Sequence, residues 1–220
     1  MKMKMALLIL KTNKPVREDS SKLRGYVGKL FPNEVLLHHH VGKKTIYAYP
    51  RVQYKIIEGT PMIVGVEEGV DVLKMISEEM RELKLGRKKY SLKGLQINIY
   101  ESNFGKCRVA RNYKIVLPWL ALNQENYKRF KEMKGWKEKK DLLSKILVAN
   151  VLSMSKSFGY TVRGKLQAKV LTLQSLKVKY KSVHMVGFVG SFRINFNIPD
   201  YLGIGKGVSH GFGTVKGTNS

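Results

Sequence analysis

Three consecutive histidines form the part of the chain best suited to chemistry. His38, His39 and His40 are three of only five histidines in the sequence. In an extended segment side chains alternate between two faces, so we expect His38 and His40 on one side and His39 on the other. Imidazoles titrate near neutral pH, so two neighbouring rings can supply a general base and a general acid. Such a pair could cleave RNA without a metal; the alternative is a surface or stacking cluster.

Metal-dependent chemistry is less favoured by the residues present. His38 and His40 could bind Zn²⁺, but the chain has no cysteine pair and no obvious third ligand nearby. Two-metal nuclease chemistry needs clustered carboxylates, whereas the four aspartates of this chain are widely separated. We therefore expect neither a metal nor another cofactor.

A glycine-rich stretch near the C-terminus is the second candidate site. Six glycines fall between Gly203 and Gly217, and Lys206 and Lys216 lie among them. Glycine tolerates positive φ and close approach, and successive backbone N–H groups can form an anion-binding concavity. The familiar nucleotide-loop spacings do not match. The alternative is a mobile tail, which the apolar residues Ile204, Val208, Phe212 and Val215 argue against.

The charge of the whole chain indicates a polyanionic partner. Among 220 residues, 41 are lysine or arginine and 16 are aspartate or glutamate, which gives a formal net charge of +25. No apolar run approaches the roughly 18 residues that a membrane-spanning helix needs. The single cysteine, Cys107, excludes an internal disulfide and indicates a reducing, cytoplasmic setting. We therefore expect a nucleic-acid partner and no membrane.

Basic and aromatic residues outside the histidines could extend a binding surface. Lys177 and Lys179 share one face of a predicted strand, where they could contact phosphates or simply protect a sheet edge. Further basic residues occur around Arg163. Four aromatic residues could stack on unpaired bases, although such residues are more often core: Tyr54, Phe104, Tyr160 and Phe212.

The elements that must position these residues follow a β-α-β-β-α-β order in the first half. We expect strands at 5–12, within 35–57, at 61–66 and at 95–100. Helices are expected at 20–30, capped by Ser20 or Ser21, and at 67–85. This order is that of a ferredoxin-like unit.

The second half is expected to be a degenerate copy of the same unit. Strands are predicted at 107–117, 170–180 and 184–198, with helices at 123–133 and from Asp141 to Gly159. The fold class is therefore α+β, with two tandem ferredoxin-like, RRM-like domains at 1–104 and 105–220, the first with the histidines and the second ending in the glycine-rich loop.

Several of these segments together resemble a known family. They are Ser21–Tyr26, Leu36–His40, Tyr47, Tyr49–Pro50, Tyr54–Gly59 and the Gly-hydrophobic-Gly, five residues, Gly-Phe-Gly pattern from Gly203 to Gly213. The set resembles the CRISPR repeat-associated RNA-binding superfamily, and within it the repeat-processing endoribonucleases of a type I-B-like branch. The resemblance implies a metal-independent endoribonuclease that cuts CRISPR precursor RNA within repeats by 2′-hydroxyl attack, leaving a 2′,3′-cyclic phosphate and a 5′-hydroxyl.

The same resemblance implies roles for individual residues. Lys29 and Tyr47 match positions beside the catalytic histidines His38 and His40, where they would stabilise charge on the phosphate. The expected RNA-binding residues are Gly203, Gly205, Lys206, Gly211, Phe212, Gly213, Lys177 and Lys179. CRISPR repeat RNA is the expected partner, with surveillance-complex subunits and a second copy of the chain as further candidates. The alternative function is a non-catalytic RNA-binding subunit of a CRISPR effector complex.

Overall fold

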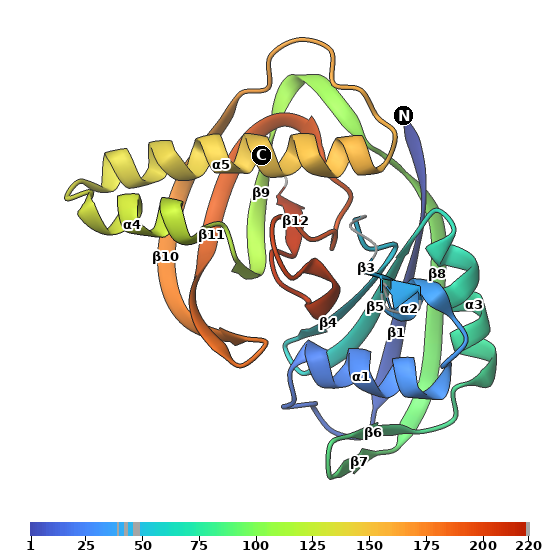
Figure 1. The fold of residues 1–220 in the computed structure, drawn as a ribbon. Helices are drawn as coiled ribbons and strands as arrows, with labels where there is room; N and C mark the ends of the chain where they lie inside the picture. The colour runs from blue at the N-terminus through green and yellow to red at the C-terminus, as the bar shows by residue number, and fades with distance from the viewer. Residues whose placement is uncertain (39, 42–43, 46–48, 219–220) are drawn as a thin grey trace. The chain divides into compact units, whose positions relative to one another are not determined.

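The computed structural model describes residues 1–38, 40–41, 44–45 and 49–218. The chain divides into two compact units. The N-terminal unit comprises Lys2–Ser102 together with Ser209–Gly211, and the C-terminal unit comprises Met1, Asn103–Val208 and Phe212–Ser220. Both units combine a four-stranded sheet with helices (Figure 1), which confirms the predicted α+β class with two ferredoxin-like domains.

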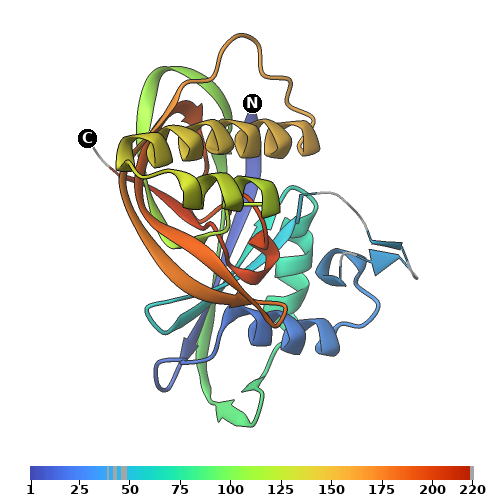
Figure 2. The same ribbon diagram turned by 60° about the vertical axis from the view of Figure 1, so that its left-hand side comes forward.

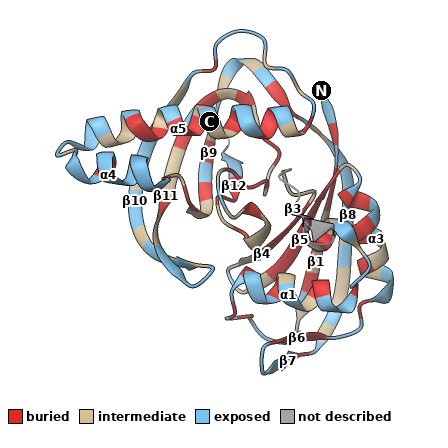
Figure 3. Cartoon of the chain, in the orientation of Figure 1, coloured by how far each residue is buried: buried red, intermediate tan, exposed pale blue. Residues whose placement is uncertain are grey.

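The N-terminal unit is built on a sheet with the strand order β4-β5-β1-β8. Its strands are β1 (Lys2–Thr12), β4 (Val52–Ile57), β5 (Thr60–Val66) and β8 (Leu92–Asn103). Helices α1 (Ser20–Leu30) and α3 (Gly69–Glu79) contribute Leu23, Val27, Val70, Leu73 and Ile76 to one core with Leu8 and Leu10 of β1. Buried residues accordingly concentrate on the strands and on the facing sides of both helices (Figure 3). The apolar spacing of these helices predicts this burial.

Two predictions about the helices α1 and α3 of this unit are wrong. Asp19, rather than Ser20 or Ser21, caps α1, since its carboxylate accepts the Lys22 N–H at 3.1 Å. The hydroxyl of Ser20 instead accepts the Ile56 N–H of edge strand β4 at 3.0 Å. The predicted 67–85 helix ends at Glu79, and Leu83–Leu85 forms strand β6, paired with β7 (Lys88–Tyr90) across a turn in which Gly86 has a φ of +62°.

Between α1 and β4 the chain forms three short elements. They are α2 (Val35–His38), β2 (His40–Val41) and β3 (Lys44–Thr45), with His40 paired to Thr45. The extended conformation predicted from residue 35 is therefore wrong for Val35–His38. Two backbone bonds lead into this helical turn: Glu34 N–H donates to Phe31 O and Leu37 N–H donates to Glu34 O, each at 3.2 Å.

The C-terminal unit has an antiparallel sheet of order β10-β11-β9-β12. Its strands are β9 (Gly105–Trp119), β10 (Ala168–Tyr180), β11 (Val183–Asn197) and β12 (Val215–Thr218). Helices α4 (Gln124–Glu132) and α5 (Trp136–Ser157) lie side by side (Figures 1 and 2), and a one-turn 3₁₀ helix spans Val208–His210. Gly135, not Asp141, is the N-cap of α5. No helix of the described chain is long and apolar enough to span a membrane.

Candidate active site and basic surfaces

The histidine segment leaves the core of the N-terminal unit from an anchored point. Leu37 is buried in the core together with Val27 and Phe31 of the α1 region, and Glu34 Oε1 accepts the Leu36 N–H at 3.2 Å. His38 follows Leu37 as the last residue of α2. Side-chain packing of α2 therefore fixes where the backbone of the histidine segment begins.

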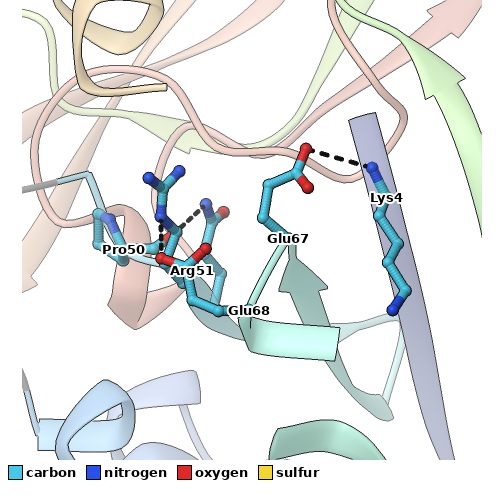
Figure 4. A network of polar contacts seen from close by, with 6 residues as sticks. Lys4, Pro50, Arg51, Glu67 and Glu68 are labelled. Atoms are coloured by element: carbon cyan, nitrogen blue, oxygen red, sulfur yellow. Dashed lines mark hydrogen bonds and ion pairs between the residues drawn. The ribbon is translucent and has the colours of Figure 1, made fainter. Parts of the chain in front are cut away.

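The segment returns to the sheet at a second anchored point, drawn in Figure 4. Arg51 Nε donates to Glu68 Oε1 at 2.8 Å, and the Arg51 carbonyl accepts the Val66 N–H at 2.8 Å. On the same side, Glu67 Oε1 accepts the Lys4 N–H at 3.3 Å, and Gln53 Nε2 donates to the Pro50 carbonyl at 3.2 Å. The first end of the histidine segment is thus packed near α1, and the second end is tied to the sheet and to the start of α3.

The arrangement of the histidines differs from the predicted alternation. His38 ends a helix and His40 begins a strand, so the period of two does not apply across the pair. His39 and Tyr47 lie outside the described residues. The roles of His38, His40 and Tyr47 stay predictions.

Lys29 lies on the exposed face of α1, in an open hollow of about 530 Å³. The lining residues that α1 contributes recur every three or four positions, so they lie on one face of the helix. We call this the α1–β6 hollow; its lining residues are Lys22, Gly25, Tyr26, Lys29, Leu30, Lys84 and Gly86. Lys22 enters the sequence analysis only as part of the Ser21–Tyr26 segment of the family resemblance, and Lys84 does not enter it as a site residue. The spacing of Lys22 and Lys29 was the sequence signal that could have related the two lysines.

Tyr26 ties α1 to the strand that forms the other wall of this hollow. Its hydroxyl donates to the Glu82 carbonyl at 3.0 Å, one residue before β6 begins. Burial of the ring, and then the nearby Glu82 carboxylate, raises the pKa of Tyr26 above its ordinary value. Tyr26 therefore stays protonated and acts as a hydrogen-bond donor that holds the hollow in shape.

Lys55 is a fully buried cation on β4 that sequence patterns did not reveal. Its Nζ donates to Gln53 Oε1 at 3.2 Å, and no carboxylate pairs with it among the described residues. Burial lowers the pKa of Lys55 to about 7. Its cross-strand partner is the buried Met62. The apolar character of β5 was the only signal for this burial, and using it requires the strand register.

The glycines of the C-terminal loop are required by packing. Gly205 and Gly213 have φ of +79° and +66°. A Cβ on Gly205 would lie 2.6 Å from Trp119 Nε1, and one on Gly213 would collide with the Ile204 carbonyl oxygen. In the N-terminal unit, Gly211 has the Ser20 hydroxyl 2.7 Å from the Cβ position. Glycine content here reflects close contacts within the protein.

Four amides of the predicted anion cradle donate to protein acceptors, so that interpretation of the loop is wrong for these four. Ile204 N–H donates to Gly213 O at 2.9 Å, and Gly213 N–H donates to Pro118 O at 2.8 Å. The N–H groups of Lys206 and Phe212 donate to Leu120 O and Gly207 O. These four amides are therefore not available to an anion.

Two aromatic rings and a lysine gather where this loop meets the β10–β11 turn. The rings of Tyr180 and Phe212 pack edge to face with centroids 5.5 Å apart, and Lys206 Nζ lies 5.8 Å from the Tyr180 centroid. Lys177 and Lys179 are exposed on edge strand β10. These side chains could stack on bases and attract phosphates.

The other proposed stacking residues are less accessible. Tyr54 and Phe104 are 0% and 1% exposed, so stacking on RNA bases is wrong for both. Tyr160 is half-buried, packs edge to face on Phe104 with centroids 5.9 Å apart, and its hydroxyl accepts the Lys106 N–H at 3.0 Å.

A second basic hollow, of about 590 Å³, lies in the C-terminal unit. Lys106 Nζ donates to the Arg163 carbonyl at 3.1 Å, and neither Arg108 nor Arg163 has an ion-pair partner within the described chain. The alternation of Lys106 and Arg108 along β9 was the available sequence signal. We call this the β9–β11 hollow; its lining residues are Lys106, Cys107, Arg108, Tyr160, Thr161, Arg163 and Asn195.

Comparison with known proteins finds relatives over both units. Residues 1–103 match the Cas6b N-terminal domain model and residues 105–218 the Cas6b C-terminal domain model. A crystal structure of Cas6b is 36% identical with a TM-score of 0.92, over 99% of this chain and 100% of that one. A crystal structure of the CRISPR RNA processing endoribonuclease Cas6b is 33% identical with a TM-score of 0.79, over 99% and 100%. The uncharacterized protein MJ0978 of Methanocaldococcus jannaschii is 46% identical over 136 residues, 62% of this chain and 92% of that protein.

Proposed function

This chain belongs to the Cas6b family, and from that premise we propose that it cuts CRISPR precursor RNA within each repeat and so releases crRNA. The observation that carries the proposal is the family match over both domains, in a chain that places two histidines within an anchored segment of the first domain. The large positive charge, +25, supports an RNA substrate.

The proposed reaction is a transesterification in which the substrate supplies the nucleophile. One imidazole, of His38 or His40, takes the proton of the 2′-hydroxyl, and the 2′-oxygen attacks the adjacent phosphorus. The bond from phosphorus to the 5′-oxygen breaks, and the other imidazole protonates that oxygen. The products are a 2′,3′-cyclic phosphate and a 5′-hydroxyl. The Lys29 ammonium and the Tyr47 hydroxyl would stabilise the negative charge that builds on the phosphate oxygens.

The test is to incubate the protein with a labelled transcript of its CRISPR repeat in excess EDTA and to analyse the product ends. We expect cleavage at one position, with a cyclic phosphate on the upstream fragment. A substrate with a 2′-deoxy sugar at the cut site should bind and stay uncut, because it lacks the attacking oxygen. Cleavage of that substrate, or loss of cleavage in EDTA, would refute the mechanism.

The same assay distinguishes the proposed endoribonuclease from the alternative function. A non-catalytic RNA-binding subunit would bind the repeat transcript and leave it intact with or without added Mg²⁺. Association with surveillance-complex subunits remains a prediction that co-purification would test. Association with a second copy of the chain remains a prediction that light scattering would test.

A further inference from the structure

Gly25 occupies a helical position that the protein's own packing does not explain. It lies in the interior of α1, is exposed, and an added Cβ would meet no atom within 4 Å. Glycine is one of the least favourable residues inside a helix, and Gly25 does not have a positive φ. At Gly69 of α3, by contrast, a Cβ would collide with the Arg51 carbonyl. Alanine would fit at Gly25 and stabilise the helix, so its absence calls for another reason.

Gly25 lies on the lining of the α1–β6 hollow, between two lysines of the same helix face. A bare helical turn at this point keeps the hollow open between Lys22 and Lys29. Gly86 on the opposite wall is explained by its turn, where it has a φ of +62°. Gly25 has no such explanation, and it leaves open space beside the two lysines.

The lining of the hollow is basic, although the Glu82 carboxylate lies near Tyr26. Lys22, Lys29 and Lys84 line it without any carboxylate among the lining residues, and none of the three is ion-paired within the part of the chain that the structure describes. Like charges held close together repel one another, and an anion that enters between them is attracted by all three. The hollow is therefore suited to a ligand with more than one negative charge.

We propose that the α1–β6 hollow binds the sugar–phosphate backbone of the repeat RNA next to the cut, with phosphates at Lys22 and Lys84 and the strand passing over Gly25. This inference rests on the proposed function, in which Lys29 of the same hollow faces the scissile phosphate. Lysine acts on phosphate as a point charge, and backbone contacts carry no sequence information directly. The subsite therefore contributes affinity and strand position, not base preference.

The first test fills the hollow by substitution at Gly25. We expect Gly25→Leu to weaken binding of a labelled repeat transcript about tenfold, since a bulky side chain would occupy the strand's path. Gly25→Ala should weaken binding less and raise the melting temperature by about 2–4 °C through better helix propensity. Gly94→Ala is the matched control, because its Cβ also meets nothing within 4 Å and it lies on β8 outside the hollow.

The second test removes the charges. Lys22→Ala and Lys84→Ala should each weaken binding and lower the slope of log affinity against log salt by about 0.7–0.9 for each phosphate that is no longer neutralised. Lys93→Ala, at an exposed lysine of β8, should change neither. Single-turnover cleavage at saturating protein should stay at the wild-type rate in the Gly94→Ala and Lys93→Ala controls, which lie on β8 outside the hollow.

These outcomes are independent of whether the proposed chemistry is right. Binding is measured in EDTA at equilibrium, so a protein that never cuts can still lose affinity in Gly25→Leu, Lys22→Ala and Lys84→Ala. Wild-type affinity and salt slope in all three variants would overturn the subsite even if the protein cleaves as proposed. Slower cleavage at saturation with unchanged affinity would also overturn it, because Gly25 would then act on the chemical step.

Discussion

The two units place positive charge in different surroundings. The N-terminal unit has the α1–β6 hollow beside a helix, and it also buries Lys55 without a carboxylate partner in the described chain. The C-terminal unit has the β9–β11 hollow and the exposed lysines of edge strand β10. The N-terminal unit alone also contains the histidine segment. We therefore expect substitutions in the first unit to separate chemistry from binding, and substitutions in the second to affect binding alone.

The glycines of the C-terminal loop and Gly25 of α1 also differ in what surrounds them. In the C-terminal unit, other atoms lie close to the position that a Cβ would take at Gly205 and at Gly213. Close packing of the loop therefore explains why glycine occurs at these positions. In the N-terminal unit Gly25 is isolated in the sequence and has no atom near its Cβ position. The difference teaches that the number of glycines in a segment is a poor guide to ligand contact. The space around each one is a better guide.

The largest expected effect would separate chemistry from binding within the N-terminal unit. Replacing His38 and His40 by alanine should slow cleavage by about 10²–10⁴-fold, the usual contribution of general acid–base catalysis. Affinity for the repeat transcript should change little, because phosphate attraction comes mainly from lysine and arginine. Single-turnover cleavage and filter binding measure the two quantities. His184→Ala, at an exposed histidine of the C-terminal unit, is the control, and a double variant that cuts at the wild-type rate would contradict the assignment.

The next prediction concerns the pH dependence of stability, to which the buried Lys55 should contribute and exposed lysines should not. Lys55 has a pKa of about 7 in the folded protein, below its ordinary 10.5. Between those two values the unfolded chain binds more protons than the folded one, so stability rises with pH. Below pH 7 both states carry the proton and the full penalty of the buried charge is present.

Lys55→Met should therefore stabilise the protein at pH 6 and lose this advantage as pH rises toward 10. The gain at low pH is at most about 5 kcal/mol from the pKa difference, less about 1 kcal/mol for the lost hydrogen bond to Gln53. Melting temperatures at pH 6 and pH 9.5 measure it, and Lys177→Met at an exposed site is the control. A destabilised variant at pH 6 would mean that the Lys55 ammonium is well solvated or paired in the fold.

Much of the fold could be predicted from sequence because local patterns and tertiary structure agree there. The apolar spacing of Leu23 and Val27 on α1, and of Leu73 and Ile76 on α3, predicts helices that face one core. All four side chains are buried together in that core. The predictions failed where contacts between residues far apart in the sequence determine the local structure. Ser20 could not be the cap of α1, since its hydroxyl bonds the edge of β4.

The candidate site was predicted less completely, for a related reason. Residue types point to His38 and His40, the family resemblance points to Lys29, and helical spacing relates Lys29 to Lys22. The other wall of the α1–β6 hollow could not be predicted from the sequence, because the apolar spacing places Lys84 in the long predicted helix at 67–85. The spacing of Leu83 and Leu85 is that of a buried strand face, and Gly86 supplies the turn. The burial of Lys55 depends on what covers one face of the sheet, which no local pattern records.

The smallest expected effect tests whether the C-terminal unit contributes to binding alone. Arg108→Ala and Arg163→Ala should each weaken repeat RNA binding up to about tenfold, with wild-type cleavage at saturation. The salt slope should fall by about 0.7–0.9 for each phosphate that the variant leaves unneutralised. Lys106 is avoided because its ammonium holds the Arg163 carbonyl. Arg193→Ala, at an exposed arginine of β11 outside the hollow, is the matched control.

Combining substitutions sharpens this last prediction. If one RNA molecule occupies both hollows, the losses of binding free energy in Arg108→Ala and Lys22→Ala should add, because the two residues line different hollows in different units and independent sites are usually additive. The salt slope of the double variant should then fall by the sum of the two single decreases. A double variant no weaker than Lys22→Ala alone would show that the β9–β11 hollow does not contact the repeat, and the positive charge of the C-terminal unit would need another explanation.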